Sequence, residues 1–576
     1  MKSIRAILIL TLVALLPGVV RAQNISQIAE SDPLIITGAV GTHNTYRYST
    51  GGSTYGSPLS NMVYANLNIS IYGFSMPFSL YYSNDNLRFN YPQITFNLTP
   101  SYGKWKGHIG QSSMAMSSYV MNMSFNGVGL EYNDNKFRAG VFYGRLRKAV
   151  NDDPTDPFAR SPQFKRMGWG FKVGYGTSRN YLDLYLLRAY DQINSIDDSW
   201  LKTITPKDNI VVGLKGCIAP LSWLNFSANA ATSVFSTDTE AEKVSTKTSF
   251  DKIFDVRYSS LMRFAGDASM NLILPGFNTS ISYRMVQPDY ISLGTNYISN
   301  NYHSLGINVS TQLFRKINLT GSFNGQEDNL TKKQLFTTRG YVYSAAVSTQ
   351  LGSHLSLMAG YNGYLQDQAD GTKHVTDSSR VHRRMESYTF SPTYSFNTTS
   401  LSHSLSASVN FTQNRDLNKF ASGESDVKTL ALGASYGLSV EPWGMNFDLT
   451  YSHQMSKGYD TRYSSDVTTL GANRAFLKDK NLNLSGSVSL AYNEVRAQSK
   501  SLSLGFNCGA SYNLAKVHML SASAGFNKYG DANMSKIHGS MDQTDISVTF
   551  NYTYTFSLIE ILSNKHKMER AKEAQY

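Results

Sequence analysis

Apolar and polar residues alternate with a period of two along most of this chain. Between Ile546 and Phe556 every second residue is apolar, and the residues between them are Ser, Thr or Asn. The stretches 482–492 and 404–411 repeat the pattern. Alternation over about ten residues predicts strands long enough to cross a bilayer at a tilt. A β-sandwich would also alternate, but its strands are usually shorter, and one core face would not recur through so long a chain.

The connections between these segments are alternately short turns and longer polar stretches, as in transmembrane barrels. We predict short turns near Tyr72–Gly73, Gly103–Lys104, Asn133–Asn135, Thr177–Arg179, Ala219–Leu221, Pro275–Gly276, Arg315–Lys316, Gly352–Ser353, Thr398–Ser400, Glu441–Trp443, Lys478–Lys480 and Leu514–Lys516. Each turn joins two strands. With one strand added at each end, the sequence predicts an all-β, antiparallel up-and-down barrel over residues 34–556. We expect about 26 strands (24–28), with short periplasmic turns and long extracellular loops.

The barrel is expected to close. Backbone groups in lipid must all be paired, and an open sheet would leave one edge unsatisfied. The first and last strands should therefore lie side by side.

The first 22 residues are typical of a secretory signal. Lys2 and Arg5 precede an apolar stretch, and small residues around Ala22 predict cleavage after that residue. We expect a short periplasmic segment at 23–33 and a basic periplasmic tail at 557–576. The tail is either a solvated cap at the barrel base or a docking segment for a periplasmic partner. No plug domain is expected before the first strand, so the chain differs from TonB-dependent receptors and from the lipopolysaccharide-assembly barrel.

Composition agrees with a wall between lipid and water. Charged residues make up 16% and hydrophobic residues 41%, with 43 Gly and 37 Tyr. The formal charge is +12, but no basic stripe indicates nucleic-acid binding. Basic groups at a membrane rim facing anionic lipid explain the charge more simply.

The sequence predicts no enzyme, no cofactor and no metal site. The eleven histidines are scattered, and neither a phosphate loop nor a nucleophile elbow occurs. Asp152, Asp153 and Asp156 lack the spacing of a calcium loop, so a solvated acidic loop is the better interpretation. Alternation places Cys217 on the lumen face and Cys508 on the lipid face, which predicts two free thiols.

The stretch Gln111–Met123 is the best sequence candidate for a lumen constriction. Four methionines interrupt a run of small residues: Met114, Met116, Met121 and Met123. A loop folded into the lumen would explain them. The alternative is that they continue a strand and face lipid.

A second candidate lies on the lumen face of 166–176 and its partner strand. Counting from the turn, Lys172 and Asp183 come nearly opposite each other, with tyrosines covering neighbouring glycines. We interpret this as a structural ion pair rather than a substrate site. No ring of one charge sign is evident, so strong ion selectivity is not indicated.

The stretch Ser101–Val150, together with MGWGFKVGYG after it, resembles the N-terminal third of large outer-membrane proteins of bacteroidetes. The resemblance rests on SYGKWKGHIG, FNGVGLEYNDNKFRAGVFYGRLRKAV and MGWGFKVGYG. It implies location and fold, and no site residues.

The sequence therefore favours an outer-membrane channel or translocon for solutes or macromolecules. The alternative is a structural barrel that anchors a surface lipoprotein or adhesin. Expected partners are outer-membrane lipid and lipopolysaccharide, the barrel-assembly machinery, and either a surface lipoprotein or a periplasmic protein.

Overall fold

The structure is a computed structural model of the whole chain. It describes residues 34–557 except 51–57, 72–73, 85–92, 152–160, 198–203, 246–252, 373, 375, 422, 478, 497–498 and 532–542. The predicted signal peptide, the segment 23–33 and the tail after Ser557 lie outside the described residues. So do the loop holding Asp152, Asp153 and Asp156 and the turn at 72–73.

Strands account for most of the described chain. The first group is β1 (Ile35–Ser49), β2 (Leu59–Ile71), β3 (Phe74–Ser83), β4 (Gln93–Leu98), β5 (Ser101–Tyr102), β6 (Trp105–Ser112), β7 (Phe125–Asn133), β8 (Phe137–Arg147) and β9 (Lys165–Gly176). The second is β10 (Tyr181–Gln192), β11 (Asp208–Leu221), β12 (Leu224–Ser236), β13 (Ser260–Leu274), β14 (Phe277–Val286), β15 (Tyr302–Leu313), β16 (Ile317–Asp328), β17 (Phe336–Leu351) and β18 (Leu355–Asp370). The third is β19 (His382–Asn397), β20 (Leu401–Asp416), β21 (Val427–Val440), β22 (Met445–Lys457), β23 (Arg462–Phe476), β24 (Leu482–Val495), β25 (Ser499–Leu514), β26 (His518–Asp531) and β27 (Gln543–Ser557).

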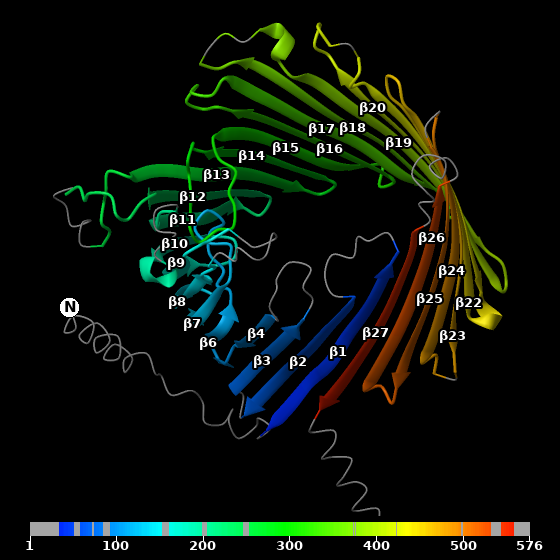
Figure 1. Cartoon of the computed structure of the whole chain (residues 1–576), viewed down its shortest axis with the longest axis horizontal. Helices are drawn as coiled ribbons and strands as arrows, with labels where there is room; N and C mark the ends of the chain where they lie inside the picture. The colour runs from blue at the N-terminus through cyan, green and yellow to red at the C-terminus, as the bar shows by residue number, and fades with distance from the viewer. Residues whose placement is uncertain are drawn as a thin grey trace, which may run out of the picture.

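The strands form one closed antiparallel barrel, as predicted (Figure 1). Each strand pairs with its neighbours in the chain, and β1 pairs with β27 from Thr37↔Ser557 to Ser49↔Asp545. The short β4 and β5 both lie between β3 and β6, so they are two pieces of one position in the wall. The 27 named strands thus fill 26 positions, which confirms the predicted number.

Tight turns connect the strands at one end of the barrel, close to the predicted places. Gly276 and Gly352 adopt positive φ there, and so do both residues of the pair Ala515–Lys516. Two successive left-handed residues are typical of hairpin turns whose twist matches the flanking strands. Longer connections occupy the opposite end, which we call the loop end. They include short 3-10 turns at Ile193–Ser195 and Asp377–Ser379.

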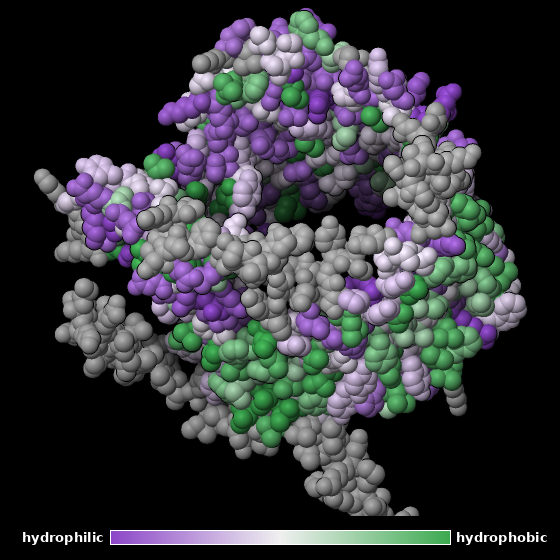
Figure 2. Space-filling model, in the orientation of Figure 1, coloured by the Kyte–Doolittle hydropathy of each residue, from purple (hydrophilic) through white to green (hydrophobic). Residues whose placement is uncertain are grey.

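The two faces of the wall differ in polarity because strand side chains alternate. On β27, Val548, Phe550 and Tyr552 point outward, while Thr549 and Asn551 point into the lumen. Figure 2 shows apolar residues gathered outside β1–β3 and β22–β27, and a hollow between these strands and those behind them. No helix in the described part of the chain is long and apolar enough to cross a membrane.

Candidate functional site: the lumen and two inward segments

A loop between β6 and β7 folds into the lumen; we call it the first inward segment (residues 113–124). It contains all four methionines singled out in the sequence. Met114 and Met121 are buried, with 4% and 3% of their surface exposed, and Met116 and Met123 are partly buried and pack against the same apolar cluster. The methionines therefore lie in an apolar cluster inside the barrel, not on a lipid-facing strand.

A second loop, between β14 and β15, packs on the first; we call it the second inward segment (residues 287–301). The Tyr290 hydroxyl donates to the carbonyl of Tyr119 at 2.9 Å. The Ser292 hydroxyl donates to the carbonyl of Val120 at 2.6 Å. The amides of Asn122 and Met123 both donate to the carbonyl of Gly294. The two segments thus satisfy each other's backbone groups and form one body.

Buried polar side chains of the wall fix this body in place. The Ser117 hydroxyl donates to Asn229 Oδ1 at 2.7 Å. Asn209, which is fully buried, accepts the Leu293 amide at 2.9 Å. The Ser233 hydroxyl donates to the carbonyl of Ile291. The last two bonds give backbone groups of the second inward segment their partners, which a loop inside a barrel needs.

The wall beneath the segments is apolar on its lumen side. We call the lumen face of β7–β14 the covered wall. Its buried apolar side chains include Phe125, Phe142, Leu146, Tyr185, Leu187, Ala189, Val211, Ala231, Phe235, Ala265 and Val286. Glycines let these side chains lie flat, because a Cβ at Gly170 would come within 2.3 Å of the Phe142 ring. The result is a dry core between wall and segments.

The prediction of an ion pair between Lys172 and Asp183 is wrong. The hairpin register places Lys172 opposite Tyr185, and Asp183 opposite Gly174. Lys172 instead contacts Glu131, which also accepts a hydrogen bond from His108.

Asp183 binds Arg138 at 2.7 Å. Both bridges cross a middle strand at a glycine: Gly140 lies between Lys172 and Glu131, and Gly174 lies between Arg138 and Asp183. The absent side chain makes room for a bridge between strands two positions apart. The glycines at 168 and 170 are covered by Leu146 and Phe142 from β8, not by tyrosines of β10.

A buried ionic cluster lies at the loop end of the covered wall. Asp191, whose side chain is 1% exposed, accepts from Arg166 Nε at 2.8 Å and from Arg147 at 3.5 Å. It also accepts the amide of Lys207. One carboxylate thus binds two guanidiniums, which leaves a net charge of +1, and ties β8 and β9 to β10.

Two buried tyrosines of the inward segments have raised pKa values. Burial raises the pKa of Tyr290, and burial together with the nearby Asp267 carboxylate raises the pKa of Tyr119. The Tyr119 hydroxyl is buried without a well-formed hydrogen bond. Both phenols are therefore held neutral in the packed arrangement.

The lumen face of β20–β27, which we call the bare wall, is built differently. In the described part of these strands, no lumen-facing side chain except glycine is buried. Its side chains are mainly Ser, Thr and Asn, which bond across strands, as in Ser406–Ser435 at 2.5 Å and Asn410–Thr389 at 2.8 Å. This wall presents neutral hydroxyl and amide groups to the lumen.

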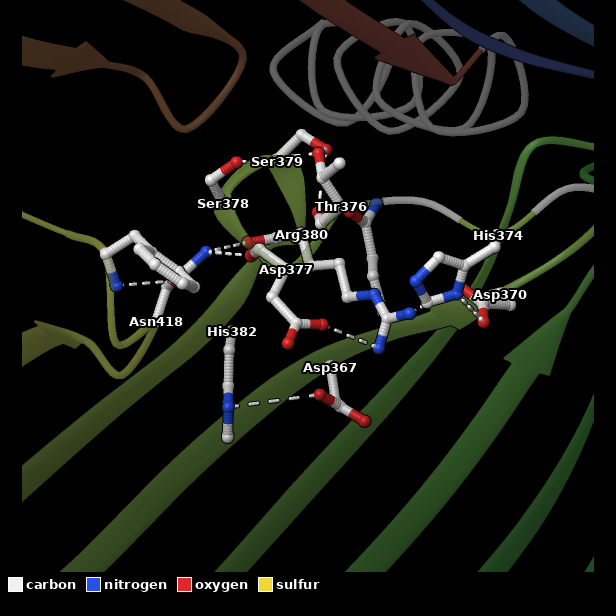
Figure 3. A network of polar contacts seen from close by, with 12 residues as sticks. Asp367, Asp370, His374, Thr376, Asp377, Ser378, Ser379, Arg380, His382 and Asn418 are labelled. Atoms are coloured by element: carbon white, nitrogen blue, oxygen red, sulfur yellow. Dashed lines mark hydrogen bonds and ion pairs between the residues drawn. The ribbon is translucent and has the colours of Figure 1, made fainter.

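Polar contacts join neighbouring connections at the loop end (Figure 3). Arg380 binds Asp370 and Asp377, and the Asn418 amide donates to the carbonyls of Asp377 and Arg380. Asn418 belongs to the next connection along the barrel, so two loops are held together. The described residues contain no group of three His, Cys, Asp or Glu side chains placed to bind a metal. Cys217 is buried and Cys508 is exposed, and neither forms a disulfide.

No model of a protein family matches the chain, and no curated protein matches it in sequence. Solved structures with a similar outline include OccAB3 of Acinetobacter baumannii, at 10% identity and a TM-score of 0.32, covering 68% of this chain and 99% of that one. The translocation pore of the P pilus usher PapC has 12% identity and a TM-score of 0.34, covering 91% and 100%. The PapC–PapD–PapK–PapG assembly intermediate of E. coli has 11% identity and a TM-score of 0.42, covering 90% and 60%. These likenesses are distant, so the proposals below rest on this chain's own residues.

Proposed function

We propose that this protein is an outer-membrane channel for hydrophilic solutes, narrowed from one side by the two inward segments. The observation that carries the proposal is the contrast within the lumen. The covered wall holds the segments on a dry core, whereas nothing in the described part of the chain packs on the hydroxyl and amide groups of the bare wall. A barrel of this strand number without packed side chains throughout has room for a water-filled passage.

The apolar outer face supports the membrane location. Closed barrels satisfy all backbone groups between strands, so they can span lipid. In this proposal the signal at 1–22 directs export, and cleavage follows Ala22. The short turns then face the periplasm and the loop end faces outward. Insertion would use the barrel-assembly machinery.

The charges suggest weak ion selectivity. In the covered wall, Lys172, Arg138 and Arg166 each have a carboxylate partner. Paired charges cancel at a distance, so the passage should treat small cations and anions similarly. We therefore infer that size, set by the inward segments, decides what passes.

Single-channel recording in planar bilayers tests the proposal directly. We expect steady conductance that falls when polymers small enough to enter the lumen are added. Silence from protein shown to be folded and inserted would contradict an open channel. It would favour a gated translocon, or a barrel that anchors a surface lipoprotein or adhesin.

A pair of glycine substitutions separates the role of the segments from that of the barrel. A Cβ at Gly294 would lie 2.3 Å from Leu187, so Gly294→Val should push the second inward segment off the wall. The matched control is Gly437→Val on the bare wall, where a Cβ meets nothing closer than 3.8 Å. We expect larger or noisier conductance from Gly294→Val and little change from the control. Equal behaviour of the two variants would mean that the segments do not limit the passage.

A further inference from the structure

Four basic residues form one row across neighbouring strands at the loop end. Lys428 on β21 lies directly opposite Lys457 on β22, and Lys457 lies opposite Arg462 on β23. The amide of Arg496, which follows β24, donates to the carbonyl of Arg462 at 2.8 Å and extends the row. Adjacent strands lie about 4.8 Å apart, so the four side chains leave the backbone within an arc of about 15 Å.

The row is on the outer face of the barrel. Lys428 shares its face with Leu430 and Leu432, and Lys457 shares its face with Met455 and Tyr451. Lumen-facing residues such as Ser435 alternate with these. All four basic residues of the row are exposed. The row is therefore accessible from outside the barrel rather than from the lumen.

None of the four has an ionic partner within the described residues. Other rim cations do: Arg339 pairs with Glu327, Arg384 with Glu386 and Lys500 with Glu494. The Arg462 guanidinium instead donates to the thioether of Met455 at 3.1 Å. A guanidinium on a thioether lacks the acceptor that best suits it.

Carboxylates do occur nearby, on the outer face as well as in the adjoining loops, but none forms an ion pair with the row within the described residues. Glu494, two positions from Arg496, pairs with Lys500. Asp466, four positions from Arg462, binds His453 and Tyr451. Asp426 accepts the amide of Asp416. Asp460 lies in the connection between β22 and β23 and makes no ion pair within the described residues. A fifth cation, Arg415, adds to the charge, since it binds Gln413 opposite Lys428.

Like charges directly opposite each other across strands are destabilising. A bound anion would therefore stabilise a row of four cations on adjacent strands. Water alone would leave the repulsion between the cations in place. A phosphate that bridges two of them would replace this repulsion by attraction.

The height of the row identifies where that anion comes from. The outward apolar residues begin two positions further along each of the first two strands, at Leu430 and Met455. At about 3.3 Å per residue, Lys428 and Lys457 stand roughly 7 Å beyond these two residues along the strand, and less along the membrane normal because barrel strands tilt. On β23 and β24 polar outward residues come first, and Leu470 and Tyr492 are the first large apolar or aromatic ones. The row is therefore at the level of lipid headgroups in the leaflet at the loop end. The connections here are short, and β22 and β23 are joined by residues 458–461 alone.

We propose that Lys428, Lys457, Arg462 and Arg496 form a binding surface for the phosphate groups of a phosphorylated glycolipid in the outer leaflet. The proposal rests on the membrane placement proposed above but not on channel activity. A closed barrel that conducts nothing would still present this surface.

The test titrates purified protein in detergent with lipid A, the phosphorylated glycolipid anchor, and detects complexes by native mass spectrometry. The row variant is Lys428→Gln, Lys457→Gln, Arg462→Gln. The matched control is Lys332→Gln, Arg339→Gln, Arg384→Gln, which removes the same charge from cations that already have partners away from the row. The single variant Lys457→Gln is measured as well, so that the proposal can still be tested if the row variant does not fold.

We expect the row variant to bind lipid A about a hundredfold more weakly and the single variant about fivefold more weakly, since each cation adds similarly to attraction for an anionic surface. The control should keep wild-type binding, and added salt should weaken only the wild-type and control complexes. Without lipid A, the row variant should melt at or above the wild-type temperature, because the repulsion is gone.

Three outcomes would overturn the proposal. Equal binding by the row variant and the control would mean that the row is not the site. Equal binding of lipid A and of its dephosphorylated form would remove phosphate as the recognised group. Full competition by inorganic phosphate at the same concentration would mean that the row binds free phosphate, not a lipid headgroup.

Discussion

The covered wall and the bare wall come from the same barrel and obey the same alternation, yet they face different surroundings. Leu187 on the covered wall is fully buried, whereas Met358, which faces the lumen from β18 outside the covered wall, is 48% exposed. The lumen-facing Thr450 and Ser452 on the bare wall are exposed as well. Outward residues do not differ in this way, because both walls present apolar side chains to the outside. The difference teaches that one side of the lumen is protein interior, while the other side is exposed among the described residues.

The largest effect should follow from removing the first inward segment. Replacing residues 114–123 by a short Gly/Ser linker removes Val120 and Met121, which are buried against the wall. We expect single-channel conductance to rise severalfold, because the second segment loses the carbonyls that it binds. Recording with graded polymers should show a larger exclusion size. An unchanged exclusion size would mean that the passage lies elsewhere.

Loss of the buried Asp191 carboxylate should strongly destabilise the covered wall. Asp191→Ala leaves Arg166 and Arg147 without their shared partner, at a cost of about 3–5 kcal/mol in the free energy of unfolding. The matched control is Asp448→Ala on the bare wall, where the carboxylate is exposed. Urea-induced unfolding in detergent should separate the two variants. Similar midpoints would show that the cluster is hydrated.

Truncation of apolar lumen-facing side chains should cost more on the covered wall than outside it. Leu187→Ala creates a cavity in the dry core and should cost about 2–5 kcal/mol. Met358→Ala removes a half-exposed side chain and should cost less than about 1 kcal/mol. Thermal unfolding measures both. If the losses were equal, the core beneath the segments would not be dry.

Alkaline pH should loosen the inward segments modestly. Tyr119 and Tyr290 have pKa values raised by burial. Their contribution to the stability of the packed segments is therefore complete below the ordinary tyrosine pKa of about 10. It is lost as pH rises above that value, because ionisation then favours the unpacked state. Conductance noise should be constant from pH 7 to 9 and increase above about pH 10. The Tyr119→Phe, Tyr290→Phe variant should lack this increase.

Much of the barrel could be predicted because each strand carries its own pattern. Alternation in segments such as 404–411 fixes which residues face lipid, and the short turns fix the strand number. The second inward segment was missed, although the sequence holds a signal for it. Leu186–Leu187 on β10 and Ile210–Val212 on β11 are apolar on both faces, which indicates that something apolar covers the lumen side.

The ion pairs could not be predicted from one hairpin. Lys172 and Asp183 were placed opposite each other by counting from the turn, and the true register differs by two residues. Their partners, Glu131 and Arg138, come from β7 and β8. Each of these ion pairs joins strands two positions apart and passes over a glycine on the intervening strand. It therefore depends on the alignment of three strands, which no single segment of sequence determines.

The pairing of β1 with β27 also sets the order of events during assembly. His43 bonds to Asn551, a partner 508 residues away in the chain. No ladder between β1 and β27 can form until the last strand has been delivered, so the growing sheet keeps two free edges throughout its synthesis and transport. Contacts this distant make folding slow. Survival of the exported chain therefore depends on how long those edges are kept from pairing with other chains.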